Sequence, residues 1–338
     1  MRKIFSIILL SFFLFSCHPE GNEPNIFDPS VEVICVYTPR GIGDNSTAGM
    51  IYTGVLRTTD SLGIACRFIF PITFEEGADS IAQLVRENQK GRKRLIISTD
   101  PEYSHYLQPI ADARHIIDSD STKLLVIDGA FVHPDVYTAY LSHYGVMYMA
   151  GYMAGKMADV DSVQIYMANT VYQYLREGRD GFIDGFTKER DNTIDVFDVG
   201  TWGGDIVGGF LHRDIAYMMF APNCKDRYDM VVPLCGETAM GFLRYSRDFP
   251  GCFYTMGIGL DMSIYSQDVP FSSIEYTDRM VSKCIIDWMN NSLSHYRRFG
   301  MDEGWVELML SAAYQKQLEP WVEAIYNEAV EMEVKYAN

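Results

Sequence analysis

The chain has 338 residues, of which 48% are hydrophobic and 22% charged, so it is long enough for two domains that each bury a core. Its formal net charge of −17 should repel nucleic-acid phosphates, and we expect no DNA or RNA partner. The 7 cysteines include no Cys-x-x-Cys pair, which argues against a zinc site or a thioredoxin-type motif. Cys35 and Cys235 lie in apolar runs and are expected to be buried free thiols.

The first residues have the features of an export signal. A short basic start precedes an apolar run that is too short to span a bilayer comfortably. The run ends in LFSC at 14–17, which is typical of a bacterial lipoprotein cleavage site. We therefore predict that residues 1–16 are removed, that Cys17 is lipidated, and that residues 17–30 form a tether to the membrane. A simple secretory signal or an uncleaved anchor is the alternative.

The rest of the chain alternates short β-branched apolar runs with longer segments of helical periodicity. Predicted strands lie at 31–38, 65–70, 93–99, 123–128, 162–168, 193–200, 229–236, near 252–258 and at 270–275. Predicted helices lie at 48–63, 74–89, 102–117, 146–158, 174–189, 208–221, 237–248, 276–292 and about 318–336. The helix at 146–158 carries small residues suited to close packing. Repeated βα units predict an α/β fold of two consecutive doubly wound parallel sheets, with helices on both faces of each.

Ligands of open α/β sheets bind outside the carboxyl ends of the strands. The residues at those positions are Asp44, Thr99, Asp100, Asp128, Thr201, Trp202, Gly236 and Asp261. Isolated buried carboxylates are costly, so a group of them usually signals a ligand or a cation. We expect these residues to meet in a cleft between the two domains, which is a usual place for a small ligand.

The segment VYTPRGIGDNSTAG, residues 36–49, has the order of a phosphate loop because it follows a strand and opens a helix. Gly41 and Gly43 are not followed by the third glycine of a dinucleotide fingerprint, and the Asp44 carboxylate would repel phosphates. A single aspartate is also too few for the cation site of a nucleosidase. No histidine is spaced from a serine or cysteine as in a recognisable nucleophile pair. We therefore predict no catalytic residue, cofactor or metal site.

Seven blocks resemble, in order, the signature blocks of the basic membrane protein family. They are GIGDNSTAGMIYTGV, LLVID, YMAGYMAGKMA, GRDGFIDGF, VGTWGGD, PLCGETAMG and MGIGLDMS. The family consists of bacterial substrate-binding lipoproteins with a type I periplasmic-binding fold, and its best-understood members are purine nucleoside receptors of ABC importers. The resemblance implies two lobes joined by crossing strands, with the ligand enclosed by hinge closure. We expect an N-terminal lobe of residues 31–135 and about 255–295, and a C-terminal lobe of residues 136–254 and about 296–338.

The resemblance also implies a set of ligand contacts. Asp44 and Asp128 match carboxylates that face the base in the family. Gly236 and Asp261 match positions that approach the ribose, whose two hydroxyls can both donate to one carboxylate. Trp202 matches a stacking aromatic residue and would cover one face of the base.

Two of the implied contacts depart from the family pattern. Thr47 stands where a stacking phenylalanine is expected, and Tyr276 stands near the place of a lysine. Structural alternatives also exist for the matched residues. Asp44 could cap the following helix, Asp128 could form a turn, and Trp202 could serve lobe packing.

The sequence thus predicts a lipid-anchored solute-binding protein that captures a small polar ligand, with a nucleoside as the first choice. Its partners would be an inner-membrane ABC permease and the lipid bilayer, reached through the acyl chains of Cys17. One alternative is a sensor or surface protein of the same fold for another ligand, such as a sugar or a peptide fragment. A nucleoside-processing enzyme is the less favoured alternative.

Overall fold

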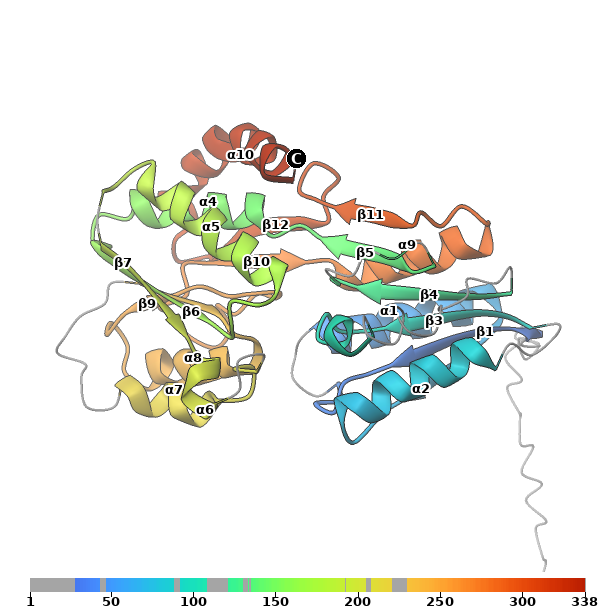
Figure 1. Cartoon of the computed structure of the whole chain (residues 1–338). Coiled ribbons are helices and arrows are strands. Elements are labelled where there is room, and N and C mark those ends of the chain that lie inside the picture. Colours follow the sequence, from blue (N-terminus) through green and yellow to red (C-terminus); the bar gives the residue numbers. More distant parts are fainter. Residues whose placement is uncertain are drawn as a thin grey trace, which may run out of the picture.

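The computed structural model describes residues 28–42, 47–87, 92–107, 121–129, 133, 135–191, 193–204, 208–220 and 230–337. Cys17, Asp44, the predicted signal and most of the predicted tether and of the 102–117 helix lie outside the described residues. Two α/β lobes stand side by side (Figure 1). Within the described ranges, no helix combines the length and the apolar character needed to cross a bilayer.

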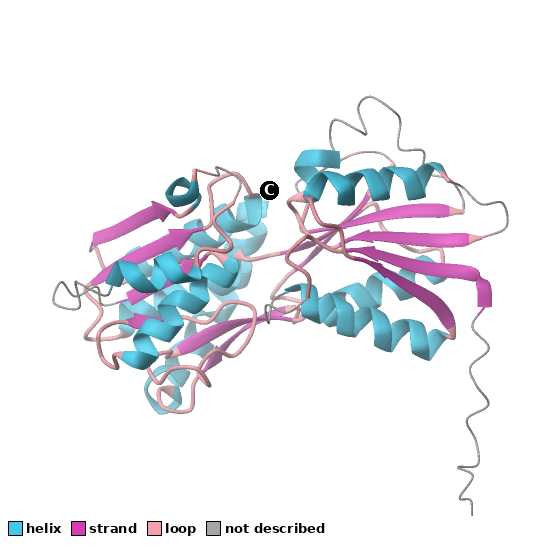
Figure 2. Ribbon diagram, turned by 90° about the horizontal axis from the view of Figure 1, so that it is seen from below, coloured by secondary structure: helices cyan, strands magenta, loops and turns pink. Residues whose placement is uncertain are grey.

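The described part of the N-terminal lobe contains a parallel sheet of six strands in the order β11-β5-β4-β3-β1-β2. These are β1 (Asp28–Val36), β2 (Ile64–Ile69), β3 (Lys93–Ser98), β4 (Thr122–Ile127), β5 (Tyr137–Leu141) and β11 (Tyr296–Phe299). Its helices are α1 (Thr47–Leu62), α2 (Phe74–Arg86) and α9 (Thr277–Met289). They lie on both faces of the sheet (Figure 2).

Both faces of this sheet are apolar, as the continuous hydrophobic runs of its strands predict. Cys35 of β1 belongs to the same buried cluster as Val55 of α1. Ile34 and Val36 of β1 belong to a second cluster that contains Ile81 of α2. Successive residues of one strand therefore face opposite layers, and each layer has its own core.

The described part of the C-terminal lobe contains a second parallel sheet, of four strands in the order β7-β6-β8-β9. These are β6 (Ser162–Met167), β7 (Thr193–Asp198), β8 (Met230–Leu234) and β9 (Tyr254–Thr255). Its helices are α4 (Tyr144–Lys156), α5 (Gln173–Thr187), α6 (Gly200–Gly203), α7 (Arg213–Phe220), α8 (Ala239–Asp248) and the short 3-10 helix η1 (Gly236–Thr238). An antiparallel pair, β10 (Phe271–Glu275) and β12 (Val306–Leu310), and the long helix α10 (Gln315–Ala337) complete the described fold.

The described chain passes between the lobes at three places. It leaves the first sheet after β5 at residues 142–143, returns from β10 to α9 at Tyr276, and leaves again after β11 at residues 300–305. The predicted lobe boundaries differ from this path, because β5 and β11 both pair within the N-terminal sheet. β10 also differs from the prediction, which assigned it to the N-terminal lobe. It is joined by a bridge between Gly257 and Ser272 to the chain after β9, and β9 pairs with β8.

The elements that the sequence analysis missed are short or polar. The sequence of β5 is YTAYL, in which polar and apolar residues do not alternate regularly. The sequence of β11 is YRRF, in which two of the four residues are charged. In contrast, the strands predicted at 31–38, 93–99, 123–128 and 162–168 are all present within two or three residues of their predicted bounds. Cys35 and Cys235 are buried free thiols, as predicted, whereas Cys252 is disulfide-bonded.

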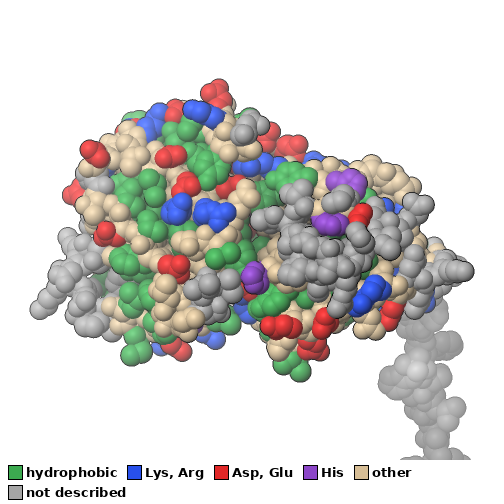
Figure 3. Space-filling model, viewed as in Figure 1, with side chains coloured by type: hydrophobic (Ala, Val, Ile, Leu, Met, Phe, Trp, Pro, Cys, Tyr) green, Lys and Arg blue, Asp and Glu red, His purple; other side chains and the backbone are tan. Residues whose placement is uncertain are grey.

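The surface charge of the protein is mixed in sign. Figure 3 shows acidic and basic side chains interspersed with apolar ones on the face that it presents. Surface ion pairs such as Lys188–Glu328, in which both side chains are at least one-third exposed, contribute little to stability.

Helices α4 and α5 approach so closely that glycine is required where they touch. A Cβ atom added to Gly151 of α4 would lie 2.0 Å from the carbonyl oxygen of Phe182 on α5. A Cβ atom added to Gly185 of α5 would lie 2.0 Å from the carbonyl oxygen of Tyr148 on α4. Because backbone atoms are the obstacle, rotation of a side chain cannot relieve either contact. The small residues predicted to pack closely therefore do so.

We predict that Gly185→Ala lowers the free energy of unfolding by about 1–3 kcal/mol. Alanine favours an isolated helix over glycine, so a loss of stability would report the steric contact with α4 rather than helix propensity. Urea denaturation followed by circular dichroism measures the change. The control is Thr187→Ala, an exposed position on the same helix. Equal stabilities of the two variants would contradict the close packing.

Candidate functional site

A cavity of about 170 Å³ lies between the lobes, at the carboxyl ends of their strands. The N-terminal lobe contributes Thr38, Arg40, Thr47, Ala48, Thr99, Asp100, Pro101 and Asp128. The C-terminal lobe contributes mainly apolar residues from α4, α5, η1 and α8 and from the chain after β8 and β9. His143, Ser273 and Glu275 lie at or beside the crossings between the lobes. The structure thus brings together five of the residues singled out from the sequence, namely Thr47, Thr99, Asp100, Asp128 and Gly236.

Arg40 pairs with two acidic residues of its own lobe and contacts an aromatic ring of the other lobe. Its guanidinium donates to Oδ2 of Asp100 at 2.6 Å and to Oε1 of Glu102 at 3.0 Å. The guanidinium carbon also lies 5.0 Å from the ring centroid of Phe210, which belongs to the C-terminal lobe. Two carboxylates therefore share this one cation, and the group as a whole remains negative.

Asp128 is fixed on the cavity wall by a turn at the end of β4. Its φ angle is +52°, in the left-handed region that aspartate tolerates better than most residues. Its Oδ1 accepts a hydrogen bond from the backbone N–H of Leu141 at 2.6 Å. Burial raises the pKa of Asp128 well above its ordinary value, although this hydrogen bond opposes the shift. Because Asp128 lines the cavity, its carboxyl group can contact a ligand held there.

Glu275 and His143 form a buried pair beside the crossings. Nδ1 of His143 lies 3.5 Å from Oε1 of Glu275, and the two side chains are only 12% and 6% exposed. Burial raises the pKa of Glu275 to about 7. Burial, aided by Arg298, lowers the pKa of His143 to about 4, so the imidazole is neutral at pH 7. Nε2 of His143 is buried and has no hydrogen-bond partner within the described residues.

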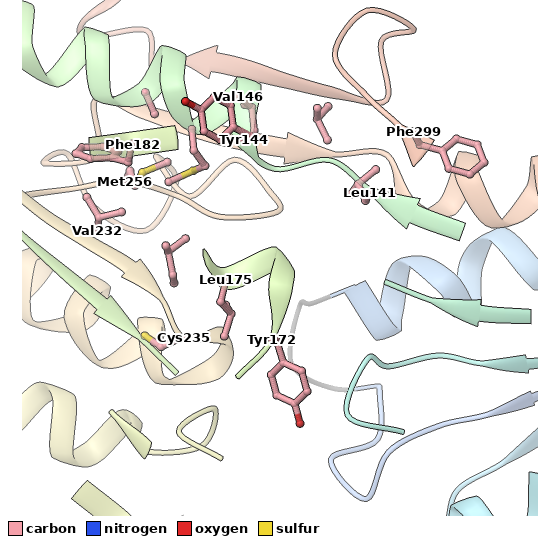
Figure 4. Close-up of a cluster of buried hydrophobic side chains, with 14 of the residues drawn as sticks. Leu141, Tyr144, Val146, Tyr172, Leu175, Phe182, Val232, Cys235, Met256 and Phe299 are labelled. Atoms are coloured by element: carbon pink, nitrogen blue, oxygen red, sulfur yellow. The ribbon is translucent and has the colours of Figure 1, made fainter. Parts of the chain in front are cut away.

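The wall from the C-terminal lobe is aromatic and apolar. Gly236 has a φ of +56°, and a Cβ atom added there would lie 3.0 Å from Cδ1 of Phe210. Glycine thus lets the backbone after β8 come close to the Phe210 ring. Figure 4 shows Leu175 on α5 and Cys235 after β8, with Tyr172 extending from the start of α5 toward the N-terminal lobe. Leu175, Cys235 and the neighbouring Tyr174 line the cavity.

Trp202 does not line this cavity, contrary to the sequence prediction. Its indole is partly buried in the core of the C-terminal lobe, where it meets Tyr166 edge-on at a centroid distance of 5.9 Å. The aromatic rings that do line the cavity from this lobe include those of Phe210 and Tyr174.

Asp261 and Tyr276 also have partners away from the cavity. Oδ1 of Asp261 accepts hydrogen bonds from the backbone N–H and the hydroxyl of Ser263, at 2.9 Å and 2.7 Å, so this carboxylate closes a local turn. The Tyr276 hydroxyl donates to Oε1 of Glu307. Because β10 alternates its side chains between two faces, Glu275 lines the cavity and its neighbour Tyr276 does not.

Sequence reasoning missed four of the polar and aromatic residues of the site: Arg40, His143, Phe210 and Glu275. His143 and Glu275 flank crossings, and β5, which leads into the first crossing, was not recognised as a strand. Arg40 directly precedes the segment with Gly41 and Gly43, and only its pairing with Asp100 shows that it faces the cavity. No cluster of three or more His, Cys, Asp and Glu side chains that could hold a metal ion exists in the described part of the chain.

Two parallel-sheet lobes, three crossings and a cavity between the lobes define a type I periplasmic-binding fold. A solute-binding protein of an ABC transporter system from Aeropyrum pernix K1 is similar, with a TM-score of 0.66 and 16% identity over 91% of this chain and 86% of that chain. GanP, a glucose-galactose binding protein from Geobacillus stearothermophilus, is similar with a TM-score of 0.62 and 13% identity over 86% and 99% of the two chains. An ABC transporter solute binding protein from Agrobacterium vitis with bound allitol is similar with a TM-score of 0.60 and 10% identity over 87% and 100%.

These similarities show the fold, and the class of the protein, a substrate-binding protein, follows from a family model. The model of the Bmp family, described as ABC transporter substrate-binding protein PnrA-like, matches residues 31–336, and the chain belongs to this family. Comparison with curated proteins finds no match. Family membership implies a small-molecule ligand and a permease partner.

We predict that Glu275→Gln changes the pH dependence of stability. The pKa of Glu275 rises from 4.5 to about 7 on folding, so the folded protein binds more protons than the unfolded chain between these values. Stability contributed by this group is therefore lost as the pH rises through that window. His143 acts in the opposite direction, because its pKa falls from 6.5 to about 4, and it is present in both proteins.

Between pH 4 and pH 8, the unfolding free energy of the wild type should fall by about 3 kcal/mol relative to that of Glu275→Gln. Denaturant unfolding across this pH range measures the difference, and Asp261→Asn is the control for loss of a nearby carboxylate outside the cavity. Parallel pH profiles of wild type and Glu275→Gln would show that Glu275 titrates normally.

Proposed function

We propose that this protein is a lipid-anchored receptor that encloses a nucleoside between its lobes and delivers it to an ABC permease. The observation that carries the proposal is the cavity between the lobes, which combines an aromatic face, Phe210, with a buried acceptor, Asp128. An aromatic face suits any base, and a fixed carboxylate oxygen suits the donor groups on its edge.

The contact between Arg40 and Phe210 supports a stacking role for both groups. Phe210 belongs to the C-terminal lobe and Arg40 to the N-terminal lobe, so separating the lobes separates the two planar groups. A guanidinium plane stacks on aromatic rings as a phenylalanine ring does. We propose that the base enters between them when the lobes open, and that Arg40 takes the place of the ring that Thr47 lacks. Closure over the base would then set the affinity.

A sugar is the second candidate ligand, and the size of the cavity favours it. A volume of about 170 Å³ is below the roughly 300–1,000 Å³ that is usual for sites of drug-sized ligands. Two of the similar structures are a glucose-galactose binding protein and a protein with bound allitol. A nucleoside would require the lobes to stand further apart than they do here.

We expect nucleosides to raise the melting temperature of the protein, whereas neutral hexoses should not. Ligand at 100 times its dissociation constant adds about 2.7 kcal/mol to stability, which thermal unfolding detects. Phe210→Leu should weaken nucleoside binding by about 1–3 kcal/mol because it removes the stacking face. Trp202→Leu should leave the affinity unchanged and lower stability instead. No stabilisation by any nucleoside, or stabilisation by hexoses alone, would contradict the nucleoside proposal.

We further propose that Cys17 carries the lipid anchor, since it follows the apolar run of an export signal. Protein expressed with its leader should partition into detergent-rich phase and its Cys17 peptide should carry acyl chains by mass spectrometry. Cys17→Ser should move the protein to the aqueous phase, because acyl chains supply the membrane affinity. An unmodified Cys17 in mature protein would refute the anchor.

A further inference from the structure

The Glu275 carboxylate faces the cavity without a balancing cation. Its side chain is only 6% exposed, and no described residue donates a hydrogen bond to it. His143 lies 3.5 Å away but is neutral at pH 7, because burial lowers its pKa to about 4. His143 therefore borders the carboxylate and leaves its charge uncompensated.

The neighbouring cations have other partners. Arg40 is shared between Asp100 and Glu102 on the wall from the N-terminal lobe. Arg298 donates to the Ser142 hydroxyl and lies 3.6 Å from Oε2 of Glu177. Asp128, on the wall from the N-terminal lobe, is acidic as well, and Glu275 contributes to raising its pKa. A buried carboxylate in such surroundings is unfavourable until a positive group arrives.

The side chain next to Glu275 on the same face of β10 belongs to Ser273. Residues two apart in a strand point the same way, and both line the cavity. The Ser273 hydroxyl has two lone pairs, and its one described contact is a long hydrogen bond of 3.4 Å from the backbone N–H of Gly259. A carboxylate and a hydroxyl oxygen are thus presented together to one ligand group. An ammonium group has three donors and no acceptor, so it can satisfy both oxygens.

We propose that Glu275 and Ser273 form a subsite for a protonated amino group of the bound ligand. The subsite selects amine-bearing ligands over neutral ones and rejects ligands that carry a phosphate or carboxylate at this end. It rests on the proposed function only in that the ligand occupies this cavity, and it does not depend on the ligand's being a nucleoside. His143 is a positioning residue that packs against the carboxylate without neutralising it.

Two matched pairs of probes test the subsite by isothermal titration calorimetry with the full-length protein. One pair is adenosine and 5′-amino-5′-deoxyadenosine, and the other is galactose and galactosamine. At pH 8 the amino member of a pair should bind roughly tenfold more tightly than its neutral parent, since a charge-assisted hydrogen bond is about twice as strong as a neutral one. The preference should largely vanish at pH 6, because Glu275, with a pKa of about 7, is then protonated.

Glu275→Gln should bind both members of a pair with similar affinity at pH 8. Asp261→Asn is the matched control, because it removes a nearby carboxylate that does not line the cavity, and it should keep the wild-type preference. Equal affinities in the wild type, a preference that survives in Glu275→Gln, or no binding of either amino probe would overturn the subsite.

The same titrations separate this subsite from the proposed function. If adenosine binds and its amino analogue binds no more tightly, the nucleoside proposal stands and the subsite is overturned. If galactosamine binds more tightly than galactose and both nucleosides fail to bind, the subsite is supported and the nucleoside proposal is overturned.

Discussion

The buried carboxylate of Glu333 holds together the crossings on which the arrangement of the lobes depends. Its two oxygens accept from the backbone N–H groups of Gly145 and Met301, each at 3.1 Å. Gly145 opens α4 just after the first crossing, and Met301 lies within the last one, so α10 ties two of the paths between the lobes to one side chain. Burial raises the pKa of Glu333, while these hydrogen bonds oppose the shift. The cavity lies beside crossings that are themselves held by polar contacts.

This arrangement explains why buried charge gathers at the centre of the molecule. Glu177 and Arg298 are packed near the crossings, and Asp128, His143 and Glu275 line the cavity next to them. Buried ionisable groups are unfavourable for folding alone, and breaking up such a set by removing one member is costly. Their presence at the cavity fits the proposal that the site discriminates between ligands by charge. One apolar cluster runs through both lobes, and a second packs β1 against α2 in the N-terminal lobe.

The sequence predicted the repeated βα architecture because strands buried on both faces read as unbroken apolar runs. It did not predict β5 and β11, since YTAYL and YRRF lack that signature and gain their place only from neighbours in the sheet. For the same reason it missed His143, whose position depends on the path after β5. Asp128 and Gly236 were found because they directly follow strands. Trp202 and Asp261 also follow strands, yet local packing and a local turn use their side chains.

The direction of a side chain on one strand decided the chemistry of the site. Tyr276 was expected near the place of a lysine, but alternation along β10 brings Glu275 to the cavity. We infer that the acidic cavity between the two lobes takes a small, donor-rich ligand. Mass spectrometry of the small molecule released from protein purified without refolding tests it most directly. We expect a nitrogen-containing compound without phosphate or carboxylate, and recovery of a phosphorylated or carboxylated ligand at full occupancy would rule out this class of ligand.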